Sequence, residues 1–133
     1  MDLKIIYWIS ENYRYIDAYD NISHKKLGSL IIELECDEYP RYKNLCNGTK
    51  FAKIIRLETQ VNYVGQGIAS ALLYDAIERF KEYNFVLLCK PQNREGIDTL
   101  KTPSDLKKFY SKFGFSYTGE LIPTMIRKAS TLG

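Results

Sequence analysis

The chain has 133 residues, a length that indicates one domain. Hydrophobic residues make up 45% of the sequence and aromatic residues 14%, which is enough to build a sizeable core. The formal net charge of +3 falls short of the strongly basic face expected of a nucleic-acid-binding domain. Acidic and basic side chains balance in residues 1–60, so the positive excess lies in residues 61–133 and favours an anionic ligand there.

The cysteines and the apolar runs indicate where the protein resides. The three cysteines are an odd number with wide separations and no zinc-type spacing, so we expect a reducing, intracellular setting and no metal site. The N-terminal apolar run is too short for a signal peptide, and no run approaches the ~18 to 20 apolar residues of a membrane span. We therefore expect a cytoplasmic protein that binds neither membranes nor nucleic acid.

The first half of the chain is rich in strand signals. Three β-rich runs at residues 3–9, 13–19 and 27–36 are separated by short turns, which predicts an antiparallel meander. Residues 38–50 are polar and are expected to form a loop. Residues 51–61 are the next predicted strand.

A helix is predicted over residues 66–83. Its apolar residues recur at helical spacing and give one buried stripe, formed by Ile68, Leu72, Leu73, Ala76, Ile77 and Phe80. Asp75 and Arg79 form an i,i+4 pair on the solvated side. Asn84 is expected to end this helix, and the apolar run FVLLC at residues 85–89 is typical of a strand covered on both faces.

A second helix follows a polar connection of residues 90–101. Thr102 can cap it, Pro103 suits its first turn, and Gly114 is its expected stop. Two short strands are predicted at residues 116–119 and 124–128. The whole order predicts an α/β fold of the α+β type, in which helices pack on a mixed, mostly antiparallel sheet.

The most informative stretch is LETQVNYVGQGIASALL, residues 57–73. After the strand, Gly65 and Gly67 precede a helix that begins without a Ser, Thr, Asp or Asn cap. The first N–H groups of a helix have no partner inside it, and with the positive end of the helix dipole they favour an anion, most often a phosphate. From this loop alone, a turn that needs glycine only for its geometry is an equally good interpretation. The P-loop and dinucleotide fingerprints fit worse, because their lysine and third glycine are absent.

A second motif, FYSKFGF at residues 109–115, makes the first one specific. V-G-Q-G-I-A opening a helix, then a strand, then F-Y-x-K-F-G-F closing another helix resembles the GNAT family of acetyl-coenzyme A-dependent N-acetyltransferases. The resemblance covers residues 51–128. It implies an acyl-CoA N-acyltransferase-like fold, acetyl-CoA as cofactor, and transfer of the acetyl group to a primary amine by direct attack in a ternary complex.

The resemblance also implies a cofactor site. In the family's Q/R-x-x-G-x-G/A loop, Val64 takes the place of the long polar residue, Gly67 the first glycine and Ala69 the last position. The N–H groups of residues 65–69 would bind the pyrophosphate, and the strand residues 57–61 would pair with the pantetheine arm. The expected cofactor-binding residues are Leu57, Thr59, Val61, Val64, Gly65, Gln66, Gly67, Ile68, Ala69 and Asn93.

Two residues are candidates for the chemistry. Tyr110 takes the position whose tyrosine commonly acts in the family as the acid that protonates the departing thiolate. It also lies on an apolar helix stripe, and a packed ring is compatible with a hydroxyl that faces the sulfur. Glu58, on the strand that leads into the loop, is the leading candidate for the base, although a solvated strand glutamate is an equally good interpretation.

The acceptor side departs from the family. Relatives usually have two helices after the first strand, whereas this chain moves directly from strand to strand. The acceptor therefore stays open between a small-molecule amine and a protein lysine or N-terminus. Two alternatives also stay open: a non-catalytic acyl-CoA-binding module of the same fold, and a phage or mobile-element acetyltransferase that modifies a host protein lysine. Edge strands at either end could pair into a homodimer.

Overall fold

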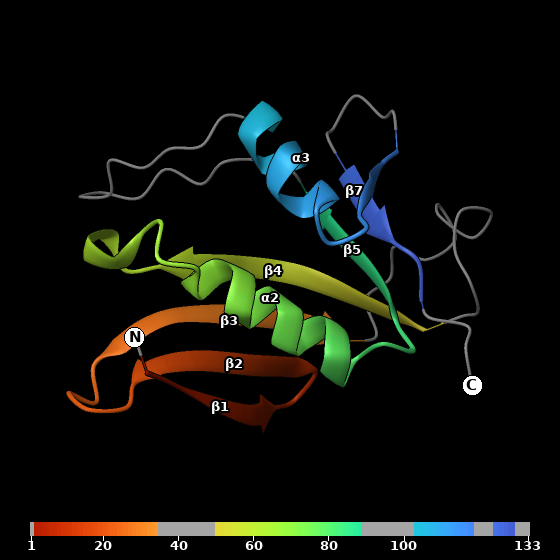
Figure 1. The fold of residues 1–133 in the computed structure, drawn as a ribbon. Coiled ribbons are helices and arrows are strands. Elements are labelled where there is room, and N and C mark those ends of the chain that lie inside the picture. Colours follow the sequence, from red (N-terminus) through yellow and green to blue (C-terminus); the bar gives the residue numbers. More distant parts are fainter. Residues whose placement is uncertain (1, 35–49, 89–102, 119–123, 130–133) are drawn as a thin grey trace.

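The computed structural model describes residues 2–34, 50–88, 103–118 and 124–129. These residues form one sheet with helices α2 and α3 on the same side of it (Figure 1). The strands follow one another across the sheet in the order β1-β2-β3-β4-β5-β7-β6. Their bounds are β1 Leu3–Ser10, β2 Tyr13–Asp20, β3 Lys26–Leu34, β4 Phe51–Thr59, β5 Asn84–Leu88, β6 Ser116–Tyr117 and β7 Thr124–Arg127. Only β4 and β5 pair in parallel, so the predicted mixed, mostly antiparallel sheet is confirmed.

The predicted N-terminal meander is also confirmed. Ser10 of β1 pairs with Tyr13 of β2, so a two-residue turn, Glu11 and Asn12, joins the two strands. The connection is too short to hold a helix, as the sequence indicated. Within the part of the chain that the structure describes, no helix is long and apolar enough to cross a membrane.

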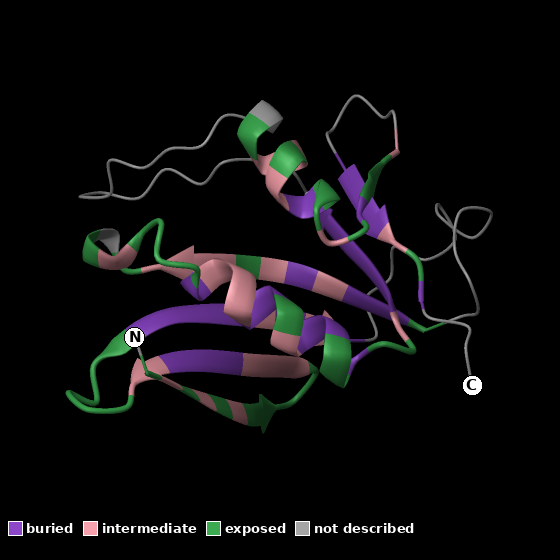
Figure 2. Cartoon of the chain, viewed as in Figure 1, coloured by how far each residue is buried: buried purple, intermediate pink, exposed green. Residues whose placement is uncertain are grey.

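Helix α2, Ile68–Arg79, packs its buried residues against strands β2, β3 and β4 in the hydrophobic core. The whole predicted stripe is buried, with exposed fractions between 0% for Leu72 and 9% for Phe80 (Figure 2). The helix is shorter than the predicted 66–83. The N–H of Phe80 closes the last turn on the carbonyl of Ala76, and the chain then turns so that Tyr83 can bond to Phe80 and enter β5.

Asn84 was predicted to end a helix, but it begins β5. It is fully buried, and its side-chain amide donates to the carbonyl of Lys50 at 3.0 Å. Its side-chain oxygen accepts the N–H of Ala129 at 2.8 Å. One buried amide thus joins the start of β4, the start of β5 and the segment that follows β7.

The turn between β2 and β3 is closed by Asp20. Its carboxylate accepts the N–H of Ile22 at 2.9 Å and that of Ser23 at 3.5 Å. The hydrogen bond from Ile22 lowers the pKa of Asp20, so this exposed carboxylate is ionised at neutral pH and keeps the turn closed.

Gly28 lets α2 approach the sheet closely. A Cβ added at this position would lie 2.8 Å from the carbonyl oxygen of Glu58, 3.0 Å from Ile68 and 3.2 Å from Leu72. Any larger residue would therefore push the start of α2 away from β3 and β4. A glycine inside a strand commonly marks such an approach of two backbones.

We predict that Gly28→Ala lowers the free energy of unfolding by about 1–3 kcal/mol, the usual range for overpacking a core. Urea denaturation followed by circular dichroism measures it. Ser116→Ala, at an exposed position of β6, is the control and should change the stability by less than about 0.5 kcal/mol. An unchanged unfolding midpoint in Gly28→Ala would show that α2 does not depend on this contact.

Candidate cofactor and active site

Within the described residues, β5 pairs with only the first part of β4. Their parallel ladder runs from Phe51 to Ile54 on β4, and among the described residues no pairing continues beyond the Ile54–Leu87 pair, although β4 runs on to Thr59. A β-bulge lies at the same place: Ile31 pairs with Arg56 and Ile32 with Ile54, so Ile55 has no counterpart on β3. A bulge bends its strand and raises the local twist, which turns the rest of β4 away from β5.

Beyond Ile54, β4 has backbone N–H and C=O groups on the side away from β3 that pair with no described strand. The N–H of Gln60 donates to the carbonyl of Leu27 at 2.8 Å, so Gln60 faces β3. Hydrogen-bonded positions alternate along an antiparallel ladder, so Glu58 also faces β3, while the N–H and C=O groups of Leu57 and Thr59 point the other way. No described strand pairs with Leu57 or Thr59 on that side. An extended ligand that carries amides could pair with them.

The chain then turns from β4 into α2. The predicted strand through Val61 was too long: β4 ends at Thr59, and Val61–Tyr63 form a 3-10 helix, η2, closed by the N–H of Tyr63 on the carbonyl of Gln60 at 2.9 Å. Gly65 and Gly67 follow with φ angles of 85° and 81°. Both glycines are needed for this left-handed backbone, which other residues adopt at a cost.

Helix α2 begins without a side-chain cap, as predicted, and its N-cap is Gly67. The first hydrogen bond of the helix runs from the N–H of Ala71 to the carbonyl of Gly67 at 3.0 Å. Among the described residues, no hydrogen bond reaches the N–H groups of Ile68, Ala69 or Ser70. The N–H of Gln66, one of the predicted donors, points instead to the carbonyl of Tyr63 at 3.4 Å. Ser70 is a donor that the sequence interpretation did not include.

The space over this loop is open. A Cβ added at Gly65 or Gly67 would meet no atom within 4 Å, so these glycines serve the backbone conformation rather than relieve crowding. Residues 64–67 are all exposed. A ligand can therefore reach the free N–H groups at the start of α2 directly.

Tyr110 is fixed by the way α3, Pro103–Ser111, ends. Gly114, with φ 88°, takes the left-handed position after the helix, and the N–H of Phe115 bonds to the carbonyl of Tyr110 at 3.3 Å. The N–H of Gly114 bonds to Ser111 at 3.1 Å, which completes a Schellman motif. The motif brings the rings of Phe115 and Tyr110 together with centroids 5.4 Å apart. The predicted stop at Gly114 is confirmed, and the F-G-F part of the second motif has a structural reason.

The Tyr110 ring lies in the core with 7% of the residue exposed. Phe115, which packs against it, also contacts Phe85 of β5 with centroids 6.3 Å apart. Tyr110 is thereby held over β5, on the helix-covered face of the sheet.

Glu58 faces the opposite side of the sheet from Tyr110. Leu57 pairs with Leu30 and Thr59 with Gly28, which lies against α2, so these residues share the helix-covered face. Glu58 alternates with them and pairs with Ser29 on the other face, where it is half-buried. The structure therefore places the two predicted catalytic residues on different faces of the sheet.

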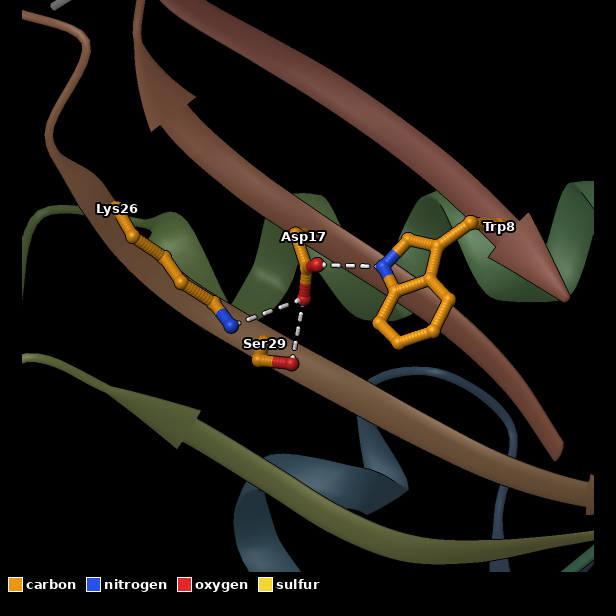
Figure 3. A network of polar contacts seen from close by, with 4 residues as sticks. All are labelled: Trp8, Asp17, Lys26 and Ser29. Carbon is orange, nitrogen blue, oxygen red and sulfur yellow. Dashed lines mark hydrogen bonds and ion pairs between the residues drawn. The ribbon is translucent and has the colours of Figure 1, made fainter. Parts of the chain in front are cut away.

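Figure 3 shows a network of polar contacts that sequence reasoning missed. It includes Ser29, the residue of β3 that pairs with Glu58. Asp17 is only 3% exposed and accepts hydrogen bonds from Trp8 Nε1 at 2.8 Å and from Ser29 Oγ at 2.6 Å. Lys26 Nζ lies 3.5 Å from the same carboxylate. Three strands are joined in this way on the face opposite α2. No short motif encodes the network, because its residues meet only once the strand register is set.

Comparisons with known proteins decide the fold. No protein-family model and no curated protein matches the sequence. The structure is similar to histone acetyltransferase HPA2 and related acetyltransferase from Corynebacterium glutamicum, with a TM-score of 0.65, 15% identity, and coverage of 91% of this chain and 67% of that one. It is similar to ribosomal-protein-S18-alanine N-acetyltransferase from Escherichia coli, with a TM-score of 0.60, 16% identity, and coverage of 94% and 74%. It is also similar to the NatC complex bound to Gag peptide and CoA, with a TM-score of 0.60, 18% identity, and coverage of 87% and 71%.

The chain has the GNAT fold. It spans about two thirds to three quarters of the length of these similar structures. Only Glu11 and Asn12 connect β1 and β2, so the predicted direct passage from strand to strand is confirmed. The side chain of Val61 and the whole of Asn93 lie outside the described residues. Sequence reasoning also missed Gly28, whose signal was a glycine inside an apolar strand.

The open N–H groups lead to a prediction about anion binding. Gly67→Ala and Gly114→Ala both place a Cβ at a φ near 80–90°, so each should cost about 1–2 kcal/mol of stability. Only Gly67→Ala should also reduce the stabilisation by added pyrophosphate, because only Gly67 orients the start of α2. Urea unfolding with and without pyrophosphate measures both effects. Equal pyrophosphate stabilisation in the two variants would contradict an anion site at this loop.

Proposed function

We propose that this protein is an acetyl-CoA-dependent N-acetyltransferase that transfers the acetyl group directly to a primary amine. One observation carries the proposal: two sets of open backbone groups lie next to each other. The N–H groups of Ile68, Ala69 and Ser70 begin α2, and the outward groups of Leu57 and Thr59 end β4. Gly28 adjoins both sets, since it pairs with Thr59 and packs against Ile68.

The shape of coenzyme A fits this combination. Its diphosphate suits N–H groups at a helix start, where the helix dipole adds to the attraction. Its pantetheine arm is extended and carries amides, which suit the outward N–H and C=O groups of Leu57 and Thr59. The similar NatC complex was solved with CoA bound, which supports the assignment. Val64 removes a polar side chain from the loop but none of these backbone donors.

When bound, acetyl-CoA supplies an acetyl thioester that a neutral amine attacks directly. In the proposed mechanism, Tyr110 gives its phenolic proton to the departing thiolate from the helix-covered side of the sheet. Glu58 accepts the proton of the attacking amine from the opposite side, directly or through water. The separation of β4 and β5 is what lets groups from both faces reach one bond.

One prediction from the proposed function concerns cofactor binding and turnover. Coenzyme A should raise the melting temperature of the protein, because a ligand that binds only the folded state adds stability by mass action. Acetyl-CoA with a panel of primary amines should then release free thiol, which a thiol-reactive dye detects. No thermal shift at millimolar ligand would overturn the cofactor assignment. A thermal shift without thiol release from any amine or protein acceptor would instead favour a non-catalytic acyl-CoA-binding module, which the two-residue turn on the acceptor side also fits.

Another prediction concerns Tyr110 as the general acid. Tyr110→Phe should lower kcat by about 10²-fold, the lower end of what general acid catalysis contributes, while the dissociation constant of coenzyme A changes little. Tyr74→Phe is a matched control, because Tyr74 lies on α2 with 62% of the residue exposed. Steady-state kinetics and isothermal titration calorimetry measure the two quantities. Unchanged kcat in Tyr110→Phe would exclude Tyr110 as the acid without affecting the cofactor site.

A further inference from the structure

Within the part of the chain that the structure describes, strand β1 is a long, regular and unprotected edge of the sheet. It is the last strand on its side, and its eight residues pair with β2 without a bulge. It contains no proline and only one charged residue, Lys4. Proteins usually protect such an edge with charges, proline, bulges or a covering segment. The opposite edge, β6, has only two residues and offers little to pair with.

The outward backbone groups of β1 can be assigned. The N–H of Asn21 donates to the carbonyl of Asp2 at 3.0 Å, so Asp2 faces β2. By alternation along the antiparallel ladder, the even-numbered residues of β1 also face β2. The outward N–H and C=O groups therefore belong to Leu3, Ile5, Tyr7 and Ile9. None of these four residues has a hydrogen bond on the outer side within the described part of the chain.

Apolar side chains are concentrated on this edge. Among the described residues, seven large hydrophobic side chains are exposed, and three of them, Ile6 at 39%, Trp8 at 45% and Ile9 at 58%, lie on β1. Figure 2 shows β1 as exposed and intermediate, beside a β2 whose middle is buried. Trp8 is held in place by two contacts, because it stacks on Tyr15 with ring centroids 3.8 Å apart and donates a hydrogen bond to Asp17. Tryptophan is among the residues that most often carry the binding energy of interfaces.

We propose that β1 pairs with β1 of a second copy of this chain, antiparallel across a two-fold axis at Ile6. This register uses every outward group: Leu3 pairs with the partner's Ile9, and Ile5 with the partner's Tyr7. A register centred one residue to either side would leave part of the outward groups without a partner on the strand. The two sheets then become one continuous sheet.

The side chains on β1 are self-complementary in this register, as a two-fold interface requires. On the face opposite α2, Ile6 meets the partner's Ile6, and Lys4 meets the partner's Trp8, a favourable cation–π pair. On the helix-covered face, Leu3 meets the partner's Ile9. No like charges face each other, so nothing in the strand opposes the pairing.

The inference does not depend on the proposed function, because β1 lies three strands away from β4. The test is the oligomeric state of the full chain by sedimentation velocity and light scattering. We expect a dimer for the unchanged chain. Ile6→Lys and Ile6→Glu, which place two like charges together at the axis, should each weaken the dimer by at least 100-fold. Ile22→Lys, at a turn residue with 82% exposure, is the control and should stay dimeric.

Mixing the two variants gives the decisive result. Ile6→Lys and Ile6→Glu in equal amounts should form a dimer again, because the two-fold axis then places opposite charges together. Ile9→Pro removes one outward N–H without breaking the ladder to β2, and it should weaken the dimer as well. Circular dichroism checks that each variant is folded. A monomeric unchanged chain, a dimer that survives Ile6→Lys, or no dimer in the mixture would each overturn the proposal.

Discussion

The arrangement of the site depends on the point at which β4 stops pairing with β5. Up to Ile54, β4 is an interior strand with neighbours on both sides. Beyond the bulge at Ile55 it keeps β3, but no described residue of β5 pairs with it, so its second row of hydrogen-bonding groups becomes available. A buried backbone group without a partner is costly, so a sheet that opens in this way must offer those groups to water or to a ligand. In the proposed function, this opening is the feature that turns a structural sheet into a binding surface.

The proposed cofactor contacts are mostly made by the backbone. Leu57 and Thr59 would act through their main-chain groups, as would Ile68, Ala69 and Ser70. A site of this kind is specified by where the chain turns, and the residues that matter most are those that set its path. Gly28 fixes how closely α2 approaches the sheet, and Gly67 fixes the direction in which α2 begins. This explains how Val64 can stand in place of a long polar residue while the donor geometry persists.

Periodicity in the sequence was sufficient to predict much of the fold. The buried stripe of α2 follows from helical spacing, and the stop at Gly114 follows from the left-handed backbone that ends a helix. The meander and the mixed sheet follow from the order of the elements. These features depend on residues close together in the chain, which is where sequence patterns carry information.

Features that depend on strand register could not be predicted in the same way. The bulge at Ile55 is defined only by how β3 and β4 pair, and it decides which face Glu58 occupies. The same register brings Asp17, Trp8 and Ser29 together from three strands. The end of β4 was predicted two residues too late, because the 3-10 turn at Val61–Tyr63 has no sequence signature distinct from that of a strand. That turn also occupies the N–H of Gln66, so the free donors begin further along the chain than expected.

Residues of β1 and β2 matter on both the face and the edge of the sheet. Among the described residues, both α helices lie on the other side of the sheet, so residues of the strands themselves stabilise the face opposite α2. The buried carboxylate of Asp17 does so, because its three partners satisfy it and tie β1, β2 and β3 together (Figure 3). Within the described residues β1 is also a bare edge, and its own Trp8 is held in place by stacking on Tyr15. In the proposed dimer, one continuous sheet face would run from Glu58 of one copy across both β1 strands to the partner's Glu58.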